Sequence, residues 1–352
     1  ILSGLVGSEM CIRDSCTWDD DYKEITQKIR RDLLKLAQVE ETEYTTVLMQ
    51  GSGSFGVESV LGSVVPKDGC VLLLSNGAYG ERAAKMCSYY EIPCIHVKQD
   101  YNKTPDANEA EELLKTHPEI THIMMIHSET TSGILNDIES IGKLAEAYGK
   151  VFIVDAMSSF AGVEIPVKDW YIDFLISSAN KCIQGVPGFS FIIANRVLLM
   201  ESKGRARSLC LDLYDQWAGM EKDGKWRYTS PTHVVLAFEQ AMKELEQEGG
   251  IKARHARYQK NMDTLVENFE NLGFRLYVDK AWQGPIIATF LYPEGKHFDF
   301  QEMYAYIKER GYAIYPGKLT DADTFRIGVI GEIYEEDVLR LTEIMKSYME
   351  QA

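Results

Sequence analysis

The feature that most constrains the fold is a pair of short apolar runs that each end in polar side chains. Residues 151–154 read Val-Phe-Ile-Val and are followed by Asp155, whereas residues 174–176 read Phe-Leu-Ile and lead through Ser-Ser-Ala-Asn to Lys181. Short apolar runs of this kind are consistent with buried strands. Because ligands bind beyond the carboxyl ends of the strands in an open α/β sheet, the acid and the amine can converge on one ligand.

An amine and an acid in this arrangement are the two groups that pyridoxal phosphate requires. Lys181 would form the Schiff base, and Asp155 would keep the pyridine nitrogen protonated so that the ring accepts electrons. Taken singly, each residue has a simpler explanation, since loop lysines are usually solvated and an Asp after a strand often forms a turn or caps a helix. The hypothesis therefore depends on the pair.

The loop of residues 50–56, Gln-Gly-Ser-Gly-Ser-Phe-Gly, lies between a predicted strand and a predicted helix. Its glycine spacing fits the fingerprint of dinucleotide-binding enzymes, but that fingerprint also requires an acid after the next strand. Residues 71–74 form that strand, and Ser75 follows it, which disfavours an NAD-dependent dehydrogenase. We interpret the loop as a helix N-terminus whose N–H groups, with the Ser52 and Ser54 hydroxyls, bind one phosphate; a simple Gly/Ser turn is the alternative.

The remaining pattern predicts an α/β fold with a mainly parallel sheet. Further strands over residues 121–126 and 189–194, the second at an edge of the sheet, alternate with helical segments. Short strands separated by helices follow from about residue 255. We therefore expect a large cofactor-binding domain over residues 16–254 and a smaller C-terminal α+β domain over residues 255–352.

Residues 1–15 differ from the rest of the chain. No basic region precedes their apolar residues and Glu9 interrupts them, so a secretion signal is not predicted. The stretch resembles a translated sequencing adapter. We expect it to be a non-native extension.

Charge and composition exclude several classes of partner. The net charge of −16 and the pI near 5.0 argue against nucleic acid and against an anionic membrane surface. The longest apolar runs fall short of the ~20 residues that span a bilayer. The seven cysteines and seven histidines lack metal-site spacing, so neither a metal centre nor a disulfide framework is predicted. Reduced thiols fit a cytoplasmic protein.

Three motifs carry a resemblance to a known family. Residues 155–160 (Asp-Ala-Met-Ser-Ser-Phe), residues 177–188 (Ser-Ser-Ala-Asn-Lys and a Gly/Pro-rich exit) and residues 229–233 (Thr-Ser-Pro-Thr-His) resemble the class V aminotransferases, small-substrate enzymes of PLP fold type I. The resemblance extends from Ser15 essentially to the C-terminus. It implies a pyridoxal 5'-phosphate enzyme that works as a homodimer with shared active sites.

The same resemblance implies roles for individual residues. Tyr79 would stack on the pyridine ring, Thr130 or Thr131 would hydrogen-bond the phenolic oxygen of the cofactor, and Thr229 would reach the cofactor phosphate of the neighbouring subunit. The implied cofactor-binding residues are Ser52, Gly53, Ser54, Tyr79, Thr130, Thr131, Asp155, Ser158, Lys181 and Thr229.

The resemblance also implies the substrates. The amine donor would be 2-aminoethylphosphonate, giving phosphonoacetaldehyde, and pyruvate would accept the amine to become L-alanine. Lys181 would move the proton as general base and acid. Arg326, in the sequence Phe-Arg-Ile-Gly, would bind the anionic group of the substrate through its forked guanidinium; a structural salt bridge is the alternative.

Two other functions stay open at this point. An alanine–glyoxylate or serine–glyoxylate transaminase would use the same cofactor chemistry on different amines. An inactive cofactor-binding homologue would result if residues 1–15 replace the family's N-terminal segment, which lies over the active site in relatives.

Overall fold

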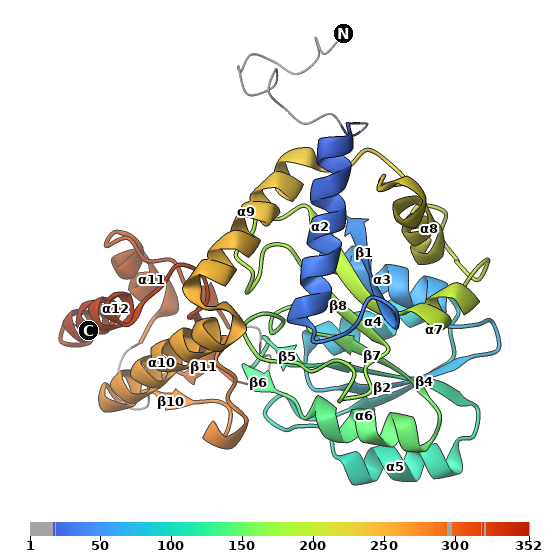
Figure 1. Ribbon diagram of the computed structural model, residues 1–352. Helices are drawn as coiled ribbons and strands as arrows, with labels where there is room; N and C mark the ends of the chain where they lie inside the picture. Colours follow the sequence, from blue (N-terminus) through green and yellow to red (C-terminus); the bar gives the residue numbers. More distant parts are fainter. Residues whose placement is uncertain (1–16, 18, 294–297, 318, 320–321, 352) are drawn as a thin grey trace.

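The computed structural model describes residues 17, 19–293, 298–317, 319 and 322–351. These residues form a large domain around a seven-stranded sheet and a smaller domain around a four-stranded sheet (Figure 1). The fold class predicted from the sequence is confirmed. The extension expected over residues 1–15 lies outside the described residues.

The large sheet has the strand order β1-β9-β8-β7-β4-β2-β3. Five neighbouring strands, from β8 to β3, run parallel, whereas β9 is antiparallel to both β8 and β1. The strand bounds are β1 Tyr44–Gln50, β2 Cys70–Ser75, β3 Cys94–Lys98, β4 Ile120–Ile126, β7 Val151–Asp155, β8 Phe174–Ser178 and β9 Phe189–Asn195. A separate two-stranded sheet joins β5 Ser128–Glu129 to β6 Ile134–Leu135.

The expectation that residues 189–194 form a sheet edge is wrong. Strand β9 lies inside the sheet because β1 pairs along its outer side over seven residues, from Tyr44 opposite Asn195 to Gln50 opposite Phe189. Six of the seven β9 residues are buried. A strand covered by helices on both faces is mainly apolar along its length, and β9 is apolar except for the buried Ser190 and the terminal Asn195.

Helices cover both faces of the large sheet. Successive β4 residues show the division, because Ile123 packs into one apolar cluster and Met124 into the other. The first cluster lies under α2 Asp20–Leu36, α5 Ala107–Thr116, α6 Ile138–Ala147 and α9 Thr232–Glu248. The second lies mainly under α3 Gly53–Val64, α4 Ala78–Tyr89, α7 Arg196–Glu201 and α8 Leu213–Asp223. Each fully buried Leu, Ile, Val, Phe or Met side chain contributes about 1.5–3 kcal/mol to this packing.

The smaller domain packs an aromatic core against its own sheet, which has the strand order β10-β11-β13-β12. Helix α10 leads into it: Tyr258 belongs to a large-domain cluster, whereas Met262 belongs to the small-domain core. The bounds are α10 Gly250–Asn271, β10 Arg275–Leu276, the 3₁₀ turn η1 Lys280–Trp282, β11 Ile287–Leu291, α11 Phe300–Lys308, β12 Tyr315–Pro316, β13 Thr324–Gly328 and α12 Glu335–Met349. The domain boundary expected at residue 255 therefore falls within α10, and it stays a prediction.

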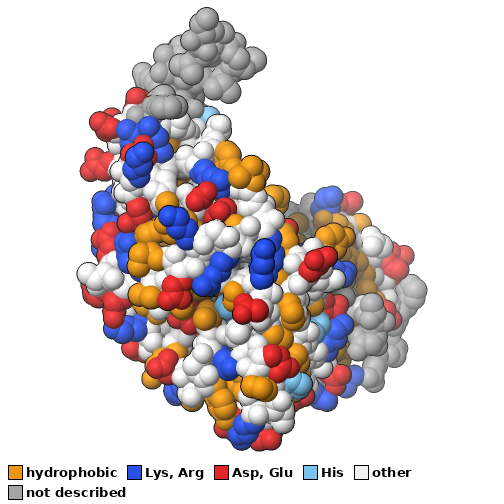
Figure 2. All heavy atoms as spheres, turned by 90° about the vertical axis from the view of Figure 1, so that its right-hand side faces the viewer, with side chains coloured by type: hydrophobic (Ala, Val, Ile, Leu, Met, Phe, Trp, Pro, Cys, Tyr) orange, Lys and Arg blue, Asp and Glu red, His pale blue; other side chains and the backbone are white. Residues whose placement is uncertain are grey.

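The surface charges and the helices of the described residues can be compared with the predictions on nucleic acid, membranes and metals. Figure 2 shows one face of the molecule, on which acidic, basic and apolar side chains of the described residues are interspersed. A nucleic-acid surface would instead gather its Lys and Arg side chains on one face. No helix among the described residues is long and apolar enough to cross a membrane. No cluster of His, Cys, Asp and Glu in the described residues could hold a metal ion.

Candidate active site

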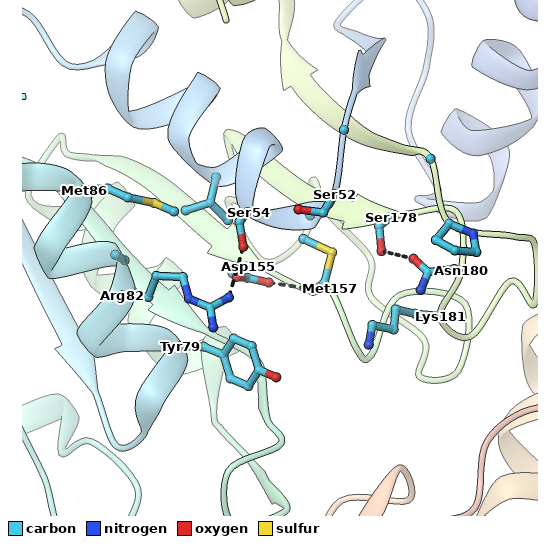
Figure 3. A pocket seen from close by; sticks show the side chains of 16 residues that line it. Ser52, Ser54, Tyr79, Arg82, Met86, Asp155, Met157, Ser178, Asn180 and Lys181 are labelled. Atoms are coloured by element: carbon cyan, nitrogen blue, oxygen red, sulfur yellow. Dashed lines mark hydrogen bonds between the residues drawn. The ribbon is translucent and has the colours of Figure 1, made fainter. Parts of the chain in front are cut away.

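A cavity of about 500 Å³ opens beyond the carboxyl ends of the β7 and β8 strands. Figure 3 shows side chains from several elements that surround it. Six residues predicted from the sequence line this cavity: Ser52, Gly53, Ser54, Tyr79, Asp155 and Lys181. The other lining residues are Gly51, Val57, Arg82, Ala83, Met86, Met157, Ser178, Asn180, Pro187 and Gly188.

Asp155 is the last residue of β7, and its carboxyl group is buried beside the cavity. Its Oδ1 accepts a hydrogen bond from the Met157 amide at 2.9 Å. Burial raises the pKa of Asp155 to about 6, because the amide bond and the positive charges of Arg82 and Lys181 offset the desolvation only in part. A cationic partner in the cavity would therefore stabilise the charged carboxylate.

Lys181 follows β8 in a tight loop and extends its amine into the cavity (Figure 3). Two backbone hydrogen bonds close the loop, from Gln184 N to Lys181 O at 2.8 Å and from Gly185 N to Ala179 O at 2.9 Å. Gln184 adopts the left-handed conformation, with φ of 68°, which is unusual for a residue with a side chain. The lysine is thus presented from a fixed turn.

The glycine-rich loop becomes the N-terminus of α3, as the sequence predicts. Gly51 has φ of +103°, a conformation that favours glycine, and it turns the chain from β1 into the helix. Ser52 is the N-cap residue, yet its side chain makes no capping hydrogen bond. The Phe55 amide donates to the Ser52 carbonyl, whereas the Ser52 hydroxyl and the amides of Gly53 and Ser54 stay available, among the described residues, for a ligand in the cavity.

The loop before α4 rests on a buried acid that sequence reasoning did not single out. Glu129 is fully buried, and burial raises its pKa despite hydrogen bonds from Thr131. The Thr131 hydroxyl donates to Glu129 Oε1 at 2.6 Å and accepts from the Ala78 amide at 3.1 Å. These contacts place Thr131 inside the protein, next to the first turn of α4, which carries Tyr79.

Arg326 lies on β13 of the smaller domain and reaches across to the large domain. Its Nη1 donates to the Thr130 carbonyl at 2.8 Å, and its Nε donates to the Pro316 carbonyl at 3.1 Å. Burial lowers the pKa of Arg326, although the nearby Tyr79, Tyr315 and Glu129 side chains counteract this effect. Among the described residues, no hydrogen bond is made to Nη2.

The remaining predicted residues lie outside the cavity lining. Ser158 is buried, and its carbonyl accepts a weak hydrogen bond from the Cys182 thiol at 3.2 Å. Thr229 lies in an exposed loop, where its carbonyl accepts from the Gln50 side chain. Within a single chain, then, the structure does not bring Thr130, Thr131, Ser158, Thr229 or Arg326 into the lining.

Arg82 is the main lining residue that sequence reasoning missed. It lies on α4 three residues after Tyr79, and its Nη1 donates to the Ser54 hydroxyl at 3.0 Å. The three-residue spacing from Tyr79 could have indicated Arg82, because residues three apart on a helix lie on the same face.

The donor set of this cavity fits pyridoxal phosphate. Lys181 offers an amine and Tyr79 an aromatic ring. Asp155 offers a buried carboxylate that has no cationic hydrogen-bond partner within the described part of the chain. The uncapped N-terminus of α3, with Ser52 and Ser54, offers donors to a phosphate. An amine, a buried acid, an aromatic ring and donors for a phosphate are thus present at one cavity.

Comparison with known proteins identifies close relatives. Residues 9–340 match the family model described as "Aminotransferase class-V". The chain is 54% identical over 338 residues to the 2-aminoethylphosphonate–pyruvate transaminase of Lysinibacillus sphaericus (strain C3-41), covering 96% of this chain and 92% of the relative. It is 52% identical over 339 residues to a bifunctional phosphonoacetaldehyde hydrolase/aminoethylphosphonate transaminase of Clostridioides difficile (strain 630), but spans only 53% of that longer protein.

Solved structures show the same fold at lower sequence identity. The alanine–glyoxylate aminotransferase of Nostoc sp. superposes with a TM-score of 0.87 at 22% identity, covering 95% of this chain and 89% of that one. The pyridoxamine–pyruvate aminotransferase of Mesorhizobium loti gives a TM-score of 0.87 at 22% identity, covering 96% and 86%. These likenesses establish the fold alone.

Proposed function

The chain belongs to the class-V aminotransferase family, and we propose that it transfers the amino group of 2-aminoethylphosphonate to pyruvate. The products are phosphonoacetaldehyde and L-alanine. The observation that carries the proposal is the convergence of Lys181 and Asp155 on one cavity, in a chain 54% identical to a transaminase named for this reaction. We do not propose the hydrolase activity in the name of the longer relative for this chain, which spans 53% of that protein.

Pyridoxal phosphate is the cofactor, and it supplies an aldehyde that condenses with amines and a ring that accepts electrons. Lys181 would hold it covalently through Nζ. When Nζ is not bound to the cofactor, it would take the proton from the amine-bearing carbon of the substrate and return it. The turn that closes on Lys181 O fixes the backbone from which the side chain extends into the cavity.

The other lining residues bind the cofactor and keep its ring nitrogen protonated. Asp155 provides the negative charge that keeps a facing ring nitrogen protonated, and its burial strengthens that interaction. Ser52, Gly53 and Ser54 bind the phosphate at the N-terminus of α3, and Tyr79 stacks on the ring. The hydroxyl of Thr131 is committed to Glu129 and the Ala78 amide, so we assign the hydrogen bond to the phenolic oxygen to Thr130.

Arg326 is the proposed anchor for the phosphonate. Two carbonyl groups, of Thr130 and Pro316, orient the guanidinium through Nη1 and Nε. Within the described residues, both N–H groups of Nη2 and the second N–H of Nη1 remain for a ligand. Orientation by carbonyls does not neutralise the positive charge. The charge therefore stays available to an anionic substrate.

We propose a homodimer in which each subunit completes the other's site through Thr229. Three exposed apolar residues support this arrangement: Phe55 on the first turn of α3 (49% exposed), Leu209 (74%) and Tyr228, next to Thr229 (40%). Burial of these side chains against a second copy would remove them from water. A cytoplasmic location is also proposed, since the described cysteines are free thiols.

A spectral titration of the cofactor-loaded protein tests the proposed reaction. 2-Aminoethylphosphonate and L-alanine, added separately, should each convert the absorbance of the bound cofactor to that of its aminated form, whereas L-serine should not. Conversion by L-serine or L-alanine without the phosphonate would place the chain with the glyoxylate transaminases. The absence of any response would indicate an inactive cofactor-binding protein.

A further inference from the structure

Arg82 lies at a junction between two helices at the phosphate end of the cavity. It belongs to α4, and its guanidinium lies next to the first turn of α3 (Figure 3). Nη1 donates to Ser54 Oγ at 3.0 Å, and the guanidinium carbon lies 5.0 Å from the centre of the Tyr79 ring. One side chain therefore contacts both a proposed phosphate donor and the proposed stacking ring.

The bond to Ser54 determines what that hydroxyl can do. A serine hydroxyl has one proton to donate and two lone pairs to accept with, whereas a guanidinium only donates. Arg82 thus occupies a lone pair of Ser54 Oγ and leaves the proton of Ser54 for another acceptor. Because Ser54 lines the cavity, that acceptor would be a ligand within it.

The charge of the cavity also points to Arg82. Its described lining residues contain two cations, Arg82 and Lys181, which lie on opposite sides in Figure 3, and one acid, Asp155. A phosphate monoester carries about −1.5 to −2 charges at neutral pH, and a helix N-terminus supplies only about +0.5. The α3 side of the cavity therefore needs a further positive charge, and Arg82 is in place to provide it.

We propose that Arg82 binds the phosphate group of pyridoxal phosphate together with Ser54, and that its contact with Tyr79 holds the stacking ring at the same time. The proposal rests on the proposed function only in that this cavity holds that cofactor. It does not depend on the identity of the amine substrate. Arg82 is therefore a cofactor-binding residue in addition to those that the sequence predicts.

The test compares cofactor forms with and without the phosphate. Apoprotein is titrated with pyridoxal phosphate and with pyridoxal, and binding is followed by absorbance for wild type, Arg82→Ala and Arg82→Lys. Arg82→Ala should weaken pyridoxal phosphate about 10- to 100-fold, the range expected for a lost hydrogen bond to a charged group, and should weaken pyridoxal far less, because pyridoxal loses only the support of the Tyr79 ring. Arg82→Lys should lose less of the affinity for pyridoxal phosphate than Arg82→Ala, because lysine keeps the positive charge but not the paired N–H donors of the guanidinium.

A neighbouring residue provides the matched control. Lys85→Ala removes an exposed cation from the same helix that does not line the cavity, so it should leave both affinities unchanged. Arg82 is itself exposed, and circular dichroism and the thermal midpoint should show that Arg82→Ala folds normally. Equal weakening of both ligands, or of neither, would overturn the assignment to the phosphate.

A double-mutant cycle tests the link through Ser54. If Arg82 acts with Ser54, the effects of Arg82→Ala and Ser54→Ala on pyridoxal phosphate binding should be clearly less than additive. Additive losses of pyridoxal phosphate affinity would show that Arg82 and Ser54 do not bind the phosphate together. Inorganic phosphate should compete with pyridoxal phosphate for wild-type apoprotein and much less for Arg82→Ala.

Steady-state kinetics separate this proposal from the proposed function. Binding is measured without substrate, so failure of the phosphonate reaction would leave the Arg82 result standing. A raised KM for 2-aminoethylphosphonate in Arg82→Ala, with unchanged affinity for pyridoxal phosphate, would instead place Arg82 on the substrate and overturn the proposal.

Discussion

Arg254 Nη1 donates to the carbonyl of Cys182, the residue that follows Lys181, at 2.7 Å. Arg254 is 1% exposed, and its charge is balanced by Glu248, whose Oε2 lies 2.6 Å from Nη2. The same Glu248 binds Arg257, which donates to the carbonyls of Gly331 and Ile333 beyond β13. Two arginines on α10 therefore connect the lysine loop with the domain that carries the proposed substrate arginine.

Arg254→Ala should destabilise the protein by about 3 kcal/mol. The change leaves buried carbonyls behind Lys181 without a donor and removes the charge that Glu248 balances. Urea unfolding measures the loss. Lys35→Ala, which removes a 76% exposed member of a surface ion pair, is the control and should change the free energy of unfolding by less than ~1 kcal/mol. Equal effects of the two substitutions would show that the Arg254 contacts do not stabilise the fold.

Lys181→Ala should abolish turnover and leave the fold intact. The side chain is partly exposed at the cavity and belongs to none of the apolar clusters formed by the described residues. Borohydride reduction of the loaded wild type should add the mass of the cofactor to the peptide that contains residue 181, and the variant should show no such addition. Lys168→Ala, which removes a surface partner of Glu43, should behave as wild type. Turnover that survives in Lys181→Ala would contradict the proposed mechanism.

The parts of the site that could be predicted from the sequence are local in the chain. Short stretches of sequence determine three features of the site: the strand that ends on Asp155, the turn that presents Lys181 and the glycine-rich start of α3. Contacts between distant segments could not be predicted in this way. The bond from Arg82 to Ser54 joins residues 28 apart, and that from Arg326 to Thr130 joins residues 196 apart.

Tertiary packing determines two further features that the sequence pattern did not predict: the orientation of Thr131 and the position of β9 in the sheet. Thr131 is turned inward because a buried Glu129 needs hydrogen-bond donors, and a buried acid beyond a strand end gives no periodic signal. The sequence pattern predicts an edge at residues 189–194, whereas β9 lies between β8 and β1. The addition of β1 outside it depends on the whole topology rather than on either sequence segment.

Arg326→Lys should raise the KM for anionic substrates about 10- to 100-fold, because the fork is lost and the ammonium cannot bind both carbonyls and a phosphonate in the same geometry. Initial rates over a range of 2-aminoethylphosphonate concentrations measure this change. Arg310→Lys, on an exposed surface of the same domain, is the matched control. An unchanged KM would remove Arg326 from the substrate site.

Asp155→Asn should change how the stability of the apoprotein depends on pH. Burial raises the pKa of Asp155 from 3.8 to about 6, so the folded protein binds more protons than the unfolded chain between these values. Folding then favours the neutral carboxyl: its contribution is fully present below about pH 4 and is lost as the pH rises through about 6. At about 1.4 kcal/mol per pKa unit, the loss amounts to ~3 kcal/mol.

Asn cannot titrate, so the variant should lack this loss. The free energy of unfolding of the wild-type apoprotein, relative to that of Asp155→Asn, should fall by ~3 kcal/mol between about pH 4 and about pH 7. Urea unfolding of both apoproteins at several pH values measures the difference and cancels the titration of buried acids that do not interact with Asp155, such as Asp173. Parallel pH profiles would show that the carboxyl is already charged without the cofactor. In the loaded enzyme the direction should reverse, because the cationic ring nitrogen stabilises the carboxylate, and the wild type should then be the more stable protein at neutral pH.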